Sequence, residues 1–151
     1  MTDRQALVRA ADEGRVIRIG PDEVILKLSA AETAGAYALL EFRTAPGSGA
    51  GPHVHHGEDE VFHILEGSLS FQLGDQEVTA GPGQVVMIPR GLRHSFRNPG
   101  PAPARSLIVF APGGVEGFFA ELAALLAAHP AGPPAADFVA LGQRYRLEFS
   151  G

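Results

Sequence analysis

The feature that most constrains the fold of this sequence is a series of short apolar segments separated by glycine and proline. The segments are EVFHILE at 60–66, SLSFQL at 68–73, QEVTA at 76–80, QVVMIP at 84–89, RHSFRN at 93–98 and RSLIVFA at 105–111. Turn residues such as Gly74-Asp75 and Gly81-Pro82-Gly83 stand between them. Short strands at this spacing are typical of β-sandwiches and β-barrels. The middle of the chain therefore predicts an all-β fold.

The segments before this series also have strand character. Residues 16–19 and 24–28 are rich in β-branched side chains and predict two short strands. Residues 35–44 predict a buried strand, and the glycine-rich stretch at 47–52 predicts a flexible loop that leads to a group of histidines. Residues 5–12 have helix-forming composition but little apolar face, which predicts a frayed start to the chain.

After Gly113-Gly114 the pattern becomes helical. Residues 117–129 place four large apolar side chains on one helical face: Phe118, Leu122, Leu125 and Leu126. A second, shorter helix is expected to begin near Pro134, because proline is tolerated in the first helical turn. We expect a short helical extension at about 115–145. The pattern leaves open whether it packs on the barrel, covers the barrel mouth or contacts a partner subunit.

Composition and charge narrow the class of protein. A chain of 151 residues with 45% hydrophobic and 19% charged residues is expected to form one soluble domain, residues 1–151. The formal net charge of -5 disfavours nucleic acid and anionic membranes as partners. The first residues lack the apolar stretch of a signal peptide, and no segment reaches the roughly 18 apolar residues of a membrane span. We therefore expect a cytoplasmic protein.

The absence of cysteine restricts any metal site to imidazole and carboxylate ligands. His53 and His55 alternate along a predicted strand, so their side chains share one face with α-carbons about 6.6 Å apart. Glu60 follows a bend at Gly57 and can approach the same ion. His94 opens a later strand and can close the coordination sphere. Such ligands suit Fe, Mn, Ni, Cu or Zn and suit Ca or Mg poorly.

Strand periodicity also predicts which side chains lie beside the metal. Phe62 and Ile64 share the parity of Glu60, and Phe96 shares that of His94, so these three are expected to point into the barrel. They are core residues first and candidate walls of a substrate pocket second. Because these walls are apolar, they favour an aromatic ligand over a polar one.

Other polar residues near the histidines have less certain roles. His56 faces the opposite side of the strand from His55 and is not expected to bind the metal. Glu58 and Asp59 either accept hydrogen bonds from ligating imidazoles or are simply solvated. The three arginines within 90–97 either receive a substrate carboxylate or belong to the ordinary surface.

Two spaced motifs carry a resemblance to a known family. The stretch 47–67 reads Gly, five residues, His-x-His, four residues, Glu, six residues, Gly, and its fixed positions are Gly47, His53, His55, Glu60 and Gly67. In the stretch 83–98 the fixed positions are Gly83, Pro89, Gly91, His94 and Asn98. Both resemble the motifs of the cupin superfamily. The sequence around HHGEDE resembles that of single-domain cupins (monocupins) described as quercetin-dioxygenase-like.

The resemblance implies a double-stranded β-helix, or jelly-roll barrel, at about 35–111, one divalent transition metal and often a homodimer. The residues that match the family's metal ligands are His53, His55, Glu60 and His94. In the family's dioxygenases the carboxylate that corresponds to Glu60 also removes a hydroxyl proton from the substrate. Glu60 is therefore the expected catalytic residue.

The leading functional hypothesis is a dioxygenase-type oxidoreductase that acts on a small hydroxylated, possibly aromatic, compound. Two alternatives stay open, because the same fold hosts many functions. One is a non-catalytic binder of a small molecule or metal, such as a sensor or storage protein. The other is a metal-dependent isomerase of sugars or keto acids, for which polar pocket walls would be expected.

Overall fold

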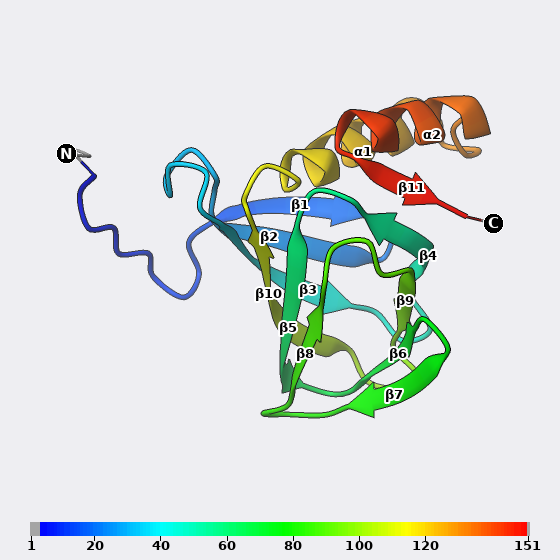
Figure 1. Ribbon diagram of the computed structural model, residues 1–151, viewed down its shortest axis with the longest axis horizontal. Helices are drawn as coiled ribbons and strands as arrows, with labels where there is room; N and C mark the ends of the chain where they lie inside the picture. The colour runs from blue at the N-terminus through cyan, green and yellow to red at the C-terminus, as the bar shows by residue number, and fades with distance from the viewer. Residues whose placement is uncertain (1–3, 151) are drawn as a thin grey trace.

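The computed structural model describes residues 4–150 as two antiparallel β-sheets with two helices at one end (Figure 1). The six-stranded sheet contains, in spatial order, β1 (Arg15–Ile19), β2 (Asp22–Leu28), β3 (Ala38–Thr44), β10 (Ala104–Ala111), β5 (Asp59–Glu66) and β8 (Val85–Ile88). The five-stranded sheet contains β11 (Leu147–Phe149), β4 (Gly49–His55), β9 (His94–Arg97), β6 (Leu69–Leu73) and β7 (Gln76–Ala80). The all-β barrel predicted from the strand spacing is confirmed.

The strands form where apolar and polar side chains alternate. On β10 every second residue is buried, from Ala104 to Phe110, because successive side chains of a strand point to opposite faces. Glu60, Phe62 and Ile64 are the buried set on β5. The largest fully buried side chains in the core are Phe62, Phe71, Phe110, Leu40, Ile64, Leu69, Ile88 and Ile108.

The chain passes repeatedly from one sheet to the other, as in a jelly roll. β4 lies in the five-stranded sheet, β5 in the six-stranded sheet, and β9 again in the five-stranded sheet beside β4. His53 and His55 on β4 therefore lie next to His94 on β9, while Glu60 on β5 faces them from the other sheet. This topology brings the three histidines and Glu60 to one part of the barrel interior.

The prediction of a loop at 47–52 is wrong for its second half, because β4 already begins at Gly49. A β-carbon at Gly49 would lie 2.0 Å from the carbonyl oxygen of Phe96 on β9, so only glycine permits this close pairing. Pro52 falls within a register irregularity between Ala50 and His53, where its missing N–H removes no regular ladder bond. Gly49 thus allows close strand contact rather than flexibility.

The predicted C-terminal helical extension is confirmed as α1 (Gly117–Ala128) and α2 (Ala135–Arg144). A short strand, β11, follows them and pairs with β4 at the edge of the five-stranded sheet. Figure 1 shows both helices over one end of the barrel, next to β1 and β4. Within residues 4–150, neither helix has the length and apolar character that a bilayer span requires.

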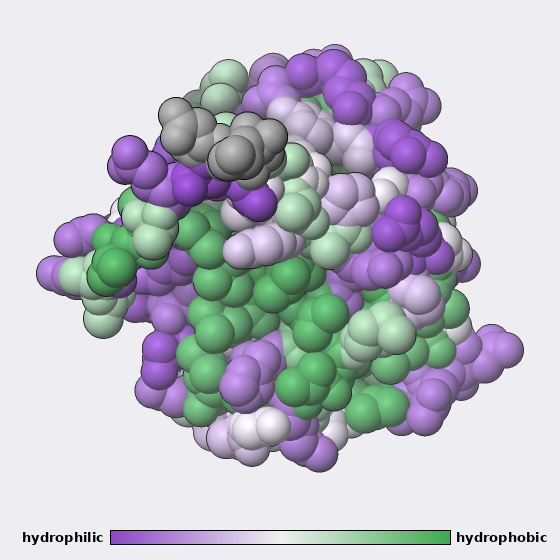
Figure 2. All heavy atoms as spheres, turned by 60° about the vertical axis from the view of Figure 1, so that its left-hand side comes forward, coloured by the Kyte–Doolittle hydropathy of each residue, from purple (hydrophilic) through white to green (hydrophobic). Residues whose placement is uncertain are grey.

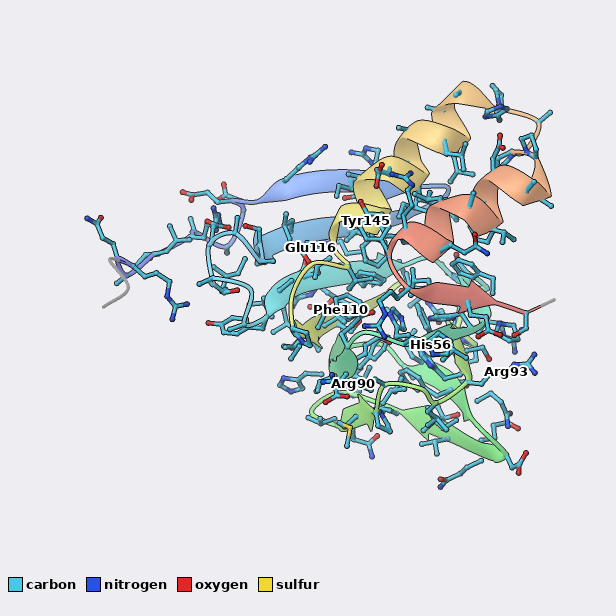
Figure 3. All side chains as sticks on the ribbon, turned by 45° about the horizontal axis from the view of Figure 1, so that its top comes forward. His56, Arg90, Arg93, Phe110, Glu116 and Tyr145 are labelled. Atoms are coloured by element: carbon cyan, nitrogen blue, oxygen red, sulfur yellow. The ribbon has the colours of Figure 1, made fainter. Side chains whose placement is uncertain are left out.

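Buried and charged contacts tie this C-terminal segment to the barrel and to itself. The carboxylate of Glu116 accepts hydrogen bonds from the backbone N–H of Ala30 (2.7 Å) and Gly114. Between the helices, Glu121 accepts hydrogen bonds from Arg144 (2.8 Å) and from the hydroxyl of Tyr145. Figure 3 shows Glu116 and Tyr145 close to where the helices meet the sheet. The extension is thus part of one packed structure.

The outer face of the six-stranded sheet is unusually apolar. Four outward side chains lie side by side across neighbouring strands in the register Leu39, Val109, Val61 and Met87. Val85 and Met87 on β8 are 61% and 60% exposed. Figure 2 shows a broad hydrophobic area on this side of the molecule. Apolar faces of this kind are a feature of contact surfaces, and the homodimer expected from the sequence stays a prediction.

Candidate metal centre

Three histidines meet inside the barrel. The ring nitrogens that His53, His55 and His94 offer as ligands all lie within 4.8 Å of one another, and all three side chains are buried. His53 and His94 are paired directly across β4 and β9, and their ring centroids are 4.3 Å apart. Alternation along β4 adds His55 to the same face, as the sequence predicts. The arrangement is the one that a shared metal ion requires.

Hydrogen bonds fix how each ring is turned. The Nδ1 atoms of His53 and His94 donate to backbone carbonyls two residues earlier in the chain, at 2.7 and 2.9 Å. The Nδ1 atom of His55 donates to the buried carboxylate of Glu58 at 2.6 Å. With Nδ1 occupied, each Nε2 carries the free lone pair, and partners of this kind orient metal-binding histidines. Of the two roles left open for Glu58, the structure has it accept a hydrogen bond from His55.

Glu60 adds a carboxylate from the opposite sheet. Its two oxygens lie 3.4 Å from Nε2 of His94 and 3.5 Å from Nε2 of His55, and the side chain is buried. Within the described part of the chain, Oε1 of Glu60 and Nε2 of His94 have no hydrogen-bond partner. Buried polar atoms without a partner destabilise a fold. A metal ion between the imidazoles and the carboxylate would satisfy both atoms, so the donor set fits a divalent transition metal.

The electrostatics suit metal binding. Burial, reinforced by the charge of His94, lowers the pKa of His53 to about 4, so this imidazole is neutral at neutral pH. Burial raises the pKa of Glu60, but contact with His94 and the charge of His55 outweigh it, and the net pKa is below its ordinary value. Burial lowers the pKa of His94, yet Glu60 raises it overall. An incoming metal ion would therefore compete with a proton at His94.

A cavity of about 570 Å³ opens from the histidines towards the C-terminal segment. On the barrel side it is lined by Ile19, Val24, Phe42, Phe96, His53, His55 and Glu60 among others, and on the C-terminal side by Phe118, Phe119, Leu122, Phe138, Val139, Leu147 and Phe149. Within residues 4–150, no lysine or arginine lines it. The candidate metal centre thus faces a largely apolar chamber of a size typical of small-molecule sites.

The structure places the three predicted pocket residues differently. Phe96 lines the cavity, whereas Phe62 and Ile64 lie outside its lining and are completely buried. The ring of Phe62 packs against those of Phe71 and Phe96, with centroids 5.0 and 5.2 Å away. The alternation of residues along a strand predicts to which face a side chain points. It does not predict where along the barrel that side chain lies. Phe62 and Ile64 are therefore core residues beneath the site and not walls of the cavity.

The sequence did not predict the cavity residues Ile19, Val24 and Phe42 on the barrel side, nor those of the C-terminal segment. Phe118, Leu122, Phe138 and Phe149 all line the cavity. Phe149 is close to the histidines, with its ring centroid 6.1 Å from that of His53. The apolar helical face at 117–129 was a usable signal, but periodicity does not reveal what a helix packs against.

The remaining polar candidates lie away from the cavity. His56 is exposed and its Nε2 is hydrogen-bonded to the Glu148 carboxylate at 2.7 Å, on the opposite side of the sheet from the metal ligands. Asp59 forms an ion pair with Arg90 rather than contacting an imidazole. Arg93, which is labelled in Figure 3, points away from the barrel and is exposed. These residues do not join the site.

Comparison with known proteins gives the family. Residues 40–110 match the family model described as the cupin domain. The match includes the three histidines and Glu60, and it spans the strands from β4 to β10 together with most of β3. Residues 40–110 form a cupin domain. The jelly-roll barrel agrees with the fold that the two motifs imply.

Individual relatives resemble the chain over part of its length. The chain is 31% identical over 84 residues to the tetracenomycin polyketide synthase protein TcmJ of Streptomyces glaucescens, covering 56% of this chain and 55% of that protein. It is 29% identical over 115 residues to protein SchB of Streptomyces halstedii, covering 74% and 82%. A solved structure from Thermotoga maritima, described as a predicted oxalate decarboxylase, is 28% identical with a TM-score of 0.65 and covers 70% of this chain and 99% of that one.

These relatives support the cupin fold but differ in the activities their names suggest. The chain spans only about half the length of TcmJ. The narrower quercetin-dioxygenase-like subgroup stays a prediction, and the activity has to be argued from the site.

Proposed function

We propose that this cupin is a metal-dependent enzyme of the dioxygenase type that acts on a small hydroxylated aromatic compound. One observation carries the proposal: three imidazoles and one carboxylate converge on a single point that faces a largely apolar cavity. The ligands would be His53, His55, His94 and Glu60, and the ion Fe, Mn, Ni, Cu or Zn. Four protein ligands leave positions free for substrate in the six-coordinate ions of this series.

Glu60 is the group in this site suited to move a proton. A bound metal would act as a Lewis acid and lower the pKa of a coordinated hydroxyl group. The Glu60 carboxyl, with its pKa below the ordinary value, is ionised at neutral pH and can accept the hydroxyl proton. Burial in the barrel shields this transfer from bulk water. Glu60 would then hold the proton while the aromatic ring reacts.

The other site residues position the substrate. The hydrogen bonds at Nδ1 of His53, His55 and His94 hold the imidazoles in place before substrate arrives. The largely apolar cavity favours a ring over a sugar or keto acid. Sugar phosphates and carboxylates commonly pair with lysine or arginine, and no such side chain among residues 4–150 lines the cavity. This supports an aromatic substrate over the isomerase alternative.

A second candidate is a ring-closing reaction that uses the same acid and base but consumes no oxygen. The likeness to TcmJ, a protein named for polyketide synthesis, favours this alternative. Polyketide intermediates are also hydroxylated and apolar, so they suit the same cavity. Glu60 would again accept a proton.

Oxygen-electrode traces of the metal-loaded protein with a panel of catechols and flavonols test the proposal. We expect oxygen uptake that depends on substrate, is lost in Glu60→Gln and persists in Glu66→Gln, a control on the exposed end of the same strand. Product formation under argon would support the ring-closing reaction instead. Bound metal with no turnover of any panel member would contradict the dioxygenase proposal.

A further inference from the structure

We propose that the C-terminal segment forms a second binding subsite, which holds the remote rings of a flat, multi-ring, uncharged aromatic ligand. We call this subsite the aromatic wall and define it by Phe118, Leu122, Phe138 and Phe149. It rests on the proposed function only in assuming that the hydroxylated end of the ligand lies at the histidines. The wall would set the size of the ligand, while the barrel sets the chemistry.

The volume of the cavity supports a ligand larger than one ring. The cavity holds about 570 Å³, whereas an engineered apolar cavity of about 150 Å³ is enough to bind benzene. A single ring at the histidines would leave much of the apolar surface without contacts, which forfeits dispersion energy. A ligand of roughly three fused rings would fill the space better.

The aromatic side chains form a continuous path from the metal ligands to the helices. The ring centroid of Phe149 lies 6.1 Å from His53, 4.3 Å from Phe138 and 5.9 Å from Phe118. The planes of Phe149 and Phe118 are inclined by 30°. Aromatic groups at such separations offer faces and edges against which a further flat ring packs favourably. A ligand that begins at His53 would meet aromatic surface along its length.

The charges around the cavity exclude an anionic remote end. No lysine or arginine from residues 4–150 lines the cavity. Among residues 4–150, Asp22 is the one aspartate that lines the cavity, and it already accepts hydrogen bonds from the backbone N–H of Ala45 (2.8 Å) and the hydroxyl of Ser48 (2.6 Å). The part of the ligand remote from the histidines would therefore be neutral.

One residue of the wall, Phe149, lies in the sheet that carries the three histidines. On β11, Leu147 pairs with His55 and Phe149 pairs with His53. A β-carbon at Gly142 would lie 2.5 Å from the ring of Phe149, so the glycine in α2 leaves the room that this ring occupies. The position of Phe149 is thus fixed from two sides, and the subsite exists before a ligand binds.

A ligand series tests the proposal. Catechol, 2,3-dihydroxynaphthalene and 2,3-dihydroxyanthracene share the same hydroxylated end and contain one, two and three linearly fused rings. Titration calorimetry with zinc-loaded and metal-free protein would measure each Kd without redox turnover. We expect about tenfold tighter binding for each added ring in both forms, because each ring removes further apolar surface from water.

Two leucines on one helix give matched variants. Leu122 lines the cavity, whereas Leu125 packs against the core outside the lining. Leu122→Ala should weaken the three-ring ligand by about tenfold and change the Kd of catechol by less than about twofold. Leu125→Ala should alter neither, and thermal melting would verify that both variants are folded.

Equal affinity for all three ligands would overturn the proposal, as would equal effects of the two leucine variants. The test is separate from the proposed function, because the dependence on ring number is expected without metal. Ring-dependent binding with no turnover would preserve the aromatic wall and refute the enzyme. Turnover with an affinity that does not depend on ring number would support the enzyme and refute the aromatic wall.

Discussion

The two sides of the cavity differ in how they are built. The barrel side carries His53, His55, Glu60 and His94 at fixed spacings, orients the three imidazoles by hydrogen bonds and places the Glu60 carboxylate among them. The C-terminal side is apolar, has no spaced motif and comes from two helices and a three-residue strand. On the two proposals made above, the barrel side would provide the chemistry and the C-terminal side would select the ligand.

The largest effect is expected from removing a barrel ligand. His94→Ala should lower the metal content from about one ion per chain to less than about a tenth. The three ligands that remain leave one side of the ion without a protein ligand. Elemental analysis after gel filtration measures this. His63→Ala, on the exposed outer side of β5, is the control and should keep its metal. If Phe138→Ala also lost its metal, the two sides of the cavity would not have the separate roles that we propose.

A smaller effect is expected from the hydrogen bond behind His55. Glu58→Gln replaces a buried charged acceptor at 2.6 Å by a neutral one. Metal affinity should fall by about 10-fold to 100-fold, the range typical of such partners. Competition with a chelating dye would measure it, with Asp59→Asn as the neighbouring control. Unchanged affinity would show that Glu58 does not support the ligand.

A change confined to the aromatic wall should leave the metal untouched. With a substrate that is turned over, Phe138→Ala should raise KM by about tenfold and leave kcat within about threefold, since it removes ring contacts remote from the reacting group. Steady-state kinetics alongside metal analysis would separate the two quantities. A loss in kcat with constant KM would mean that the wall takes part in the chemistry.

The smallest effect concerns how the C-terminal segment is held. Burial, followed by the hydrogen bond to Glu121, raises the pKa of Tyr145 from 10.0 to about 12. The folded state therefore favours the neutral phenol, so this contribution to stability is complete below pH 10 and is lost as the pH rises through 12. In Tyr37→Phe, absorbance of the remaining phenolate should give a midpoint near 12. Glu121→Gln should move that midpoint down, and an unchanged midpoint would contradict the assigned contact.

The barrel side could be predicted from the sequence because its determinants are local. The alternation of His53 and His55, and the motif spacing to Glu60 and His94, encode the convergence directly. The positions of Phe62 and Ile64 could be predicted only in part, since parity gives the face of a strand and not its depth. The order of strands in the two sheets could be predicted only from the resemblance to the cupin family.

The C-terminal side could not be predicted, for physical reasons that are visible in the structure. Phe149 lies near His53 through a strand pairing of only three residues, which is too short to leave a periodic pattern. The face of α1 was evident, but apolar helical faces pack equally well on a barrel, over its mouth or on another subunit. The position of the C-terminal segment over the cavity depends on packing between residues that are far apart in the sequence.

The central claim is that one metal ion is held by three imidazoles and one carboxylate. X-ray absorption at the metal edge of the reconstituted protein measures this coordination directly. The account predicts three imidazole nitrogens and at least one carboxylate oxygen around the ion. A protein that takes up no metal, or a spectrum with fewer than three imidazoles, would contradict it.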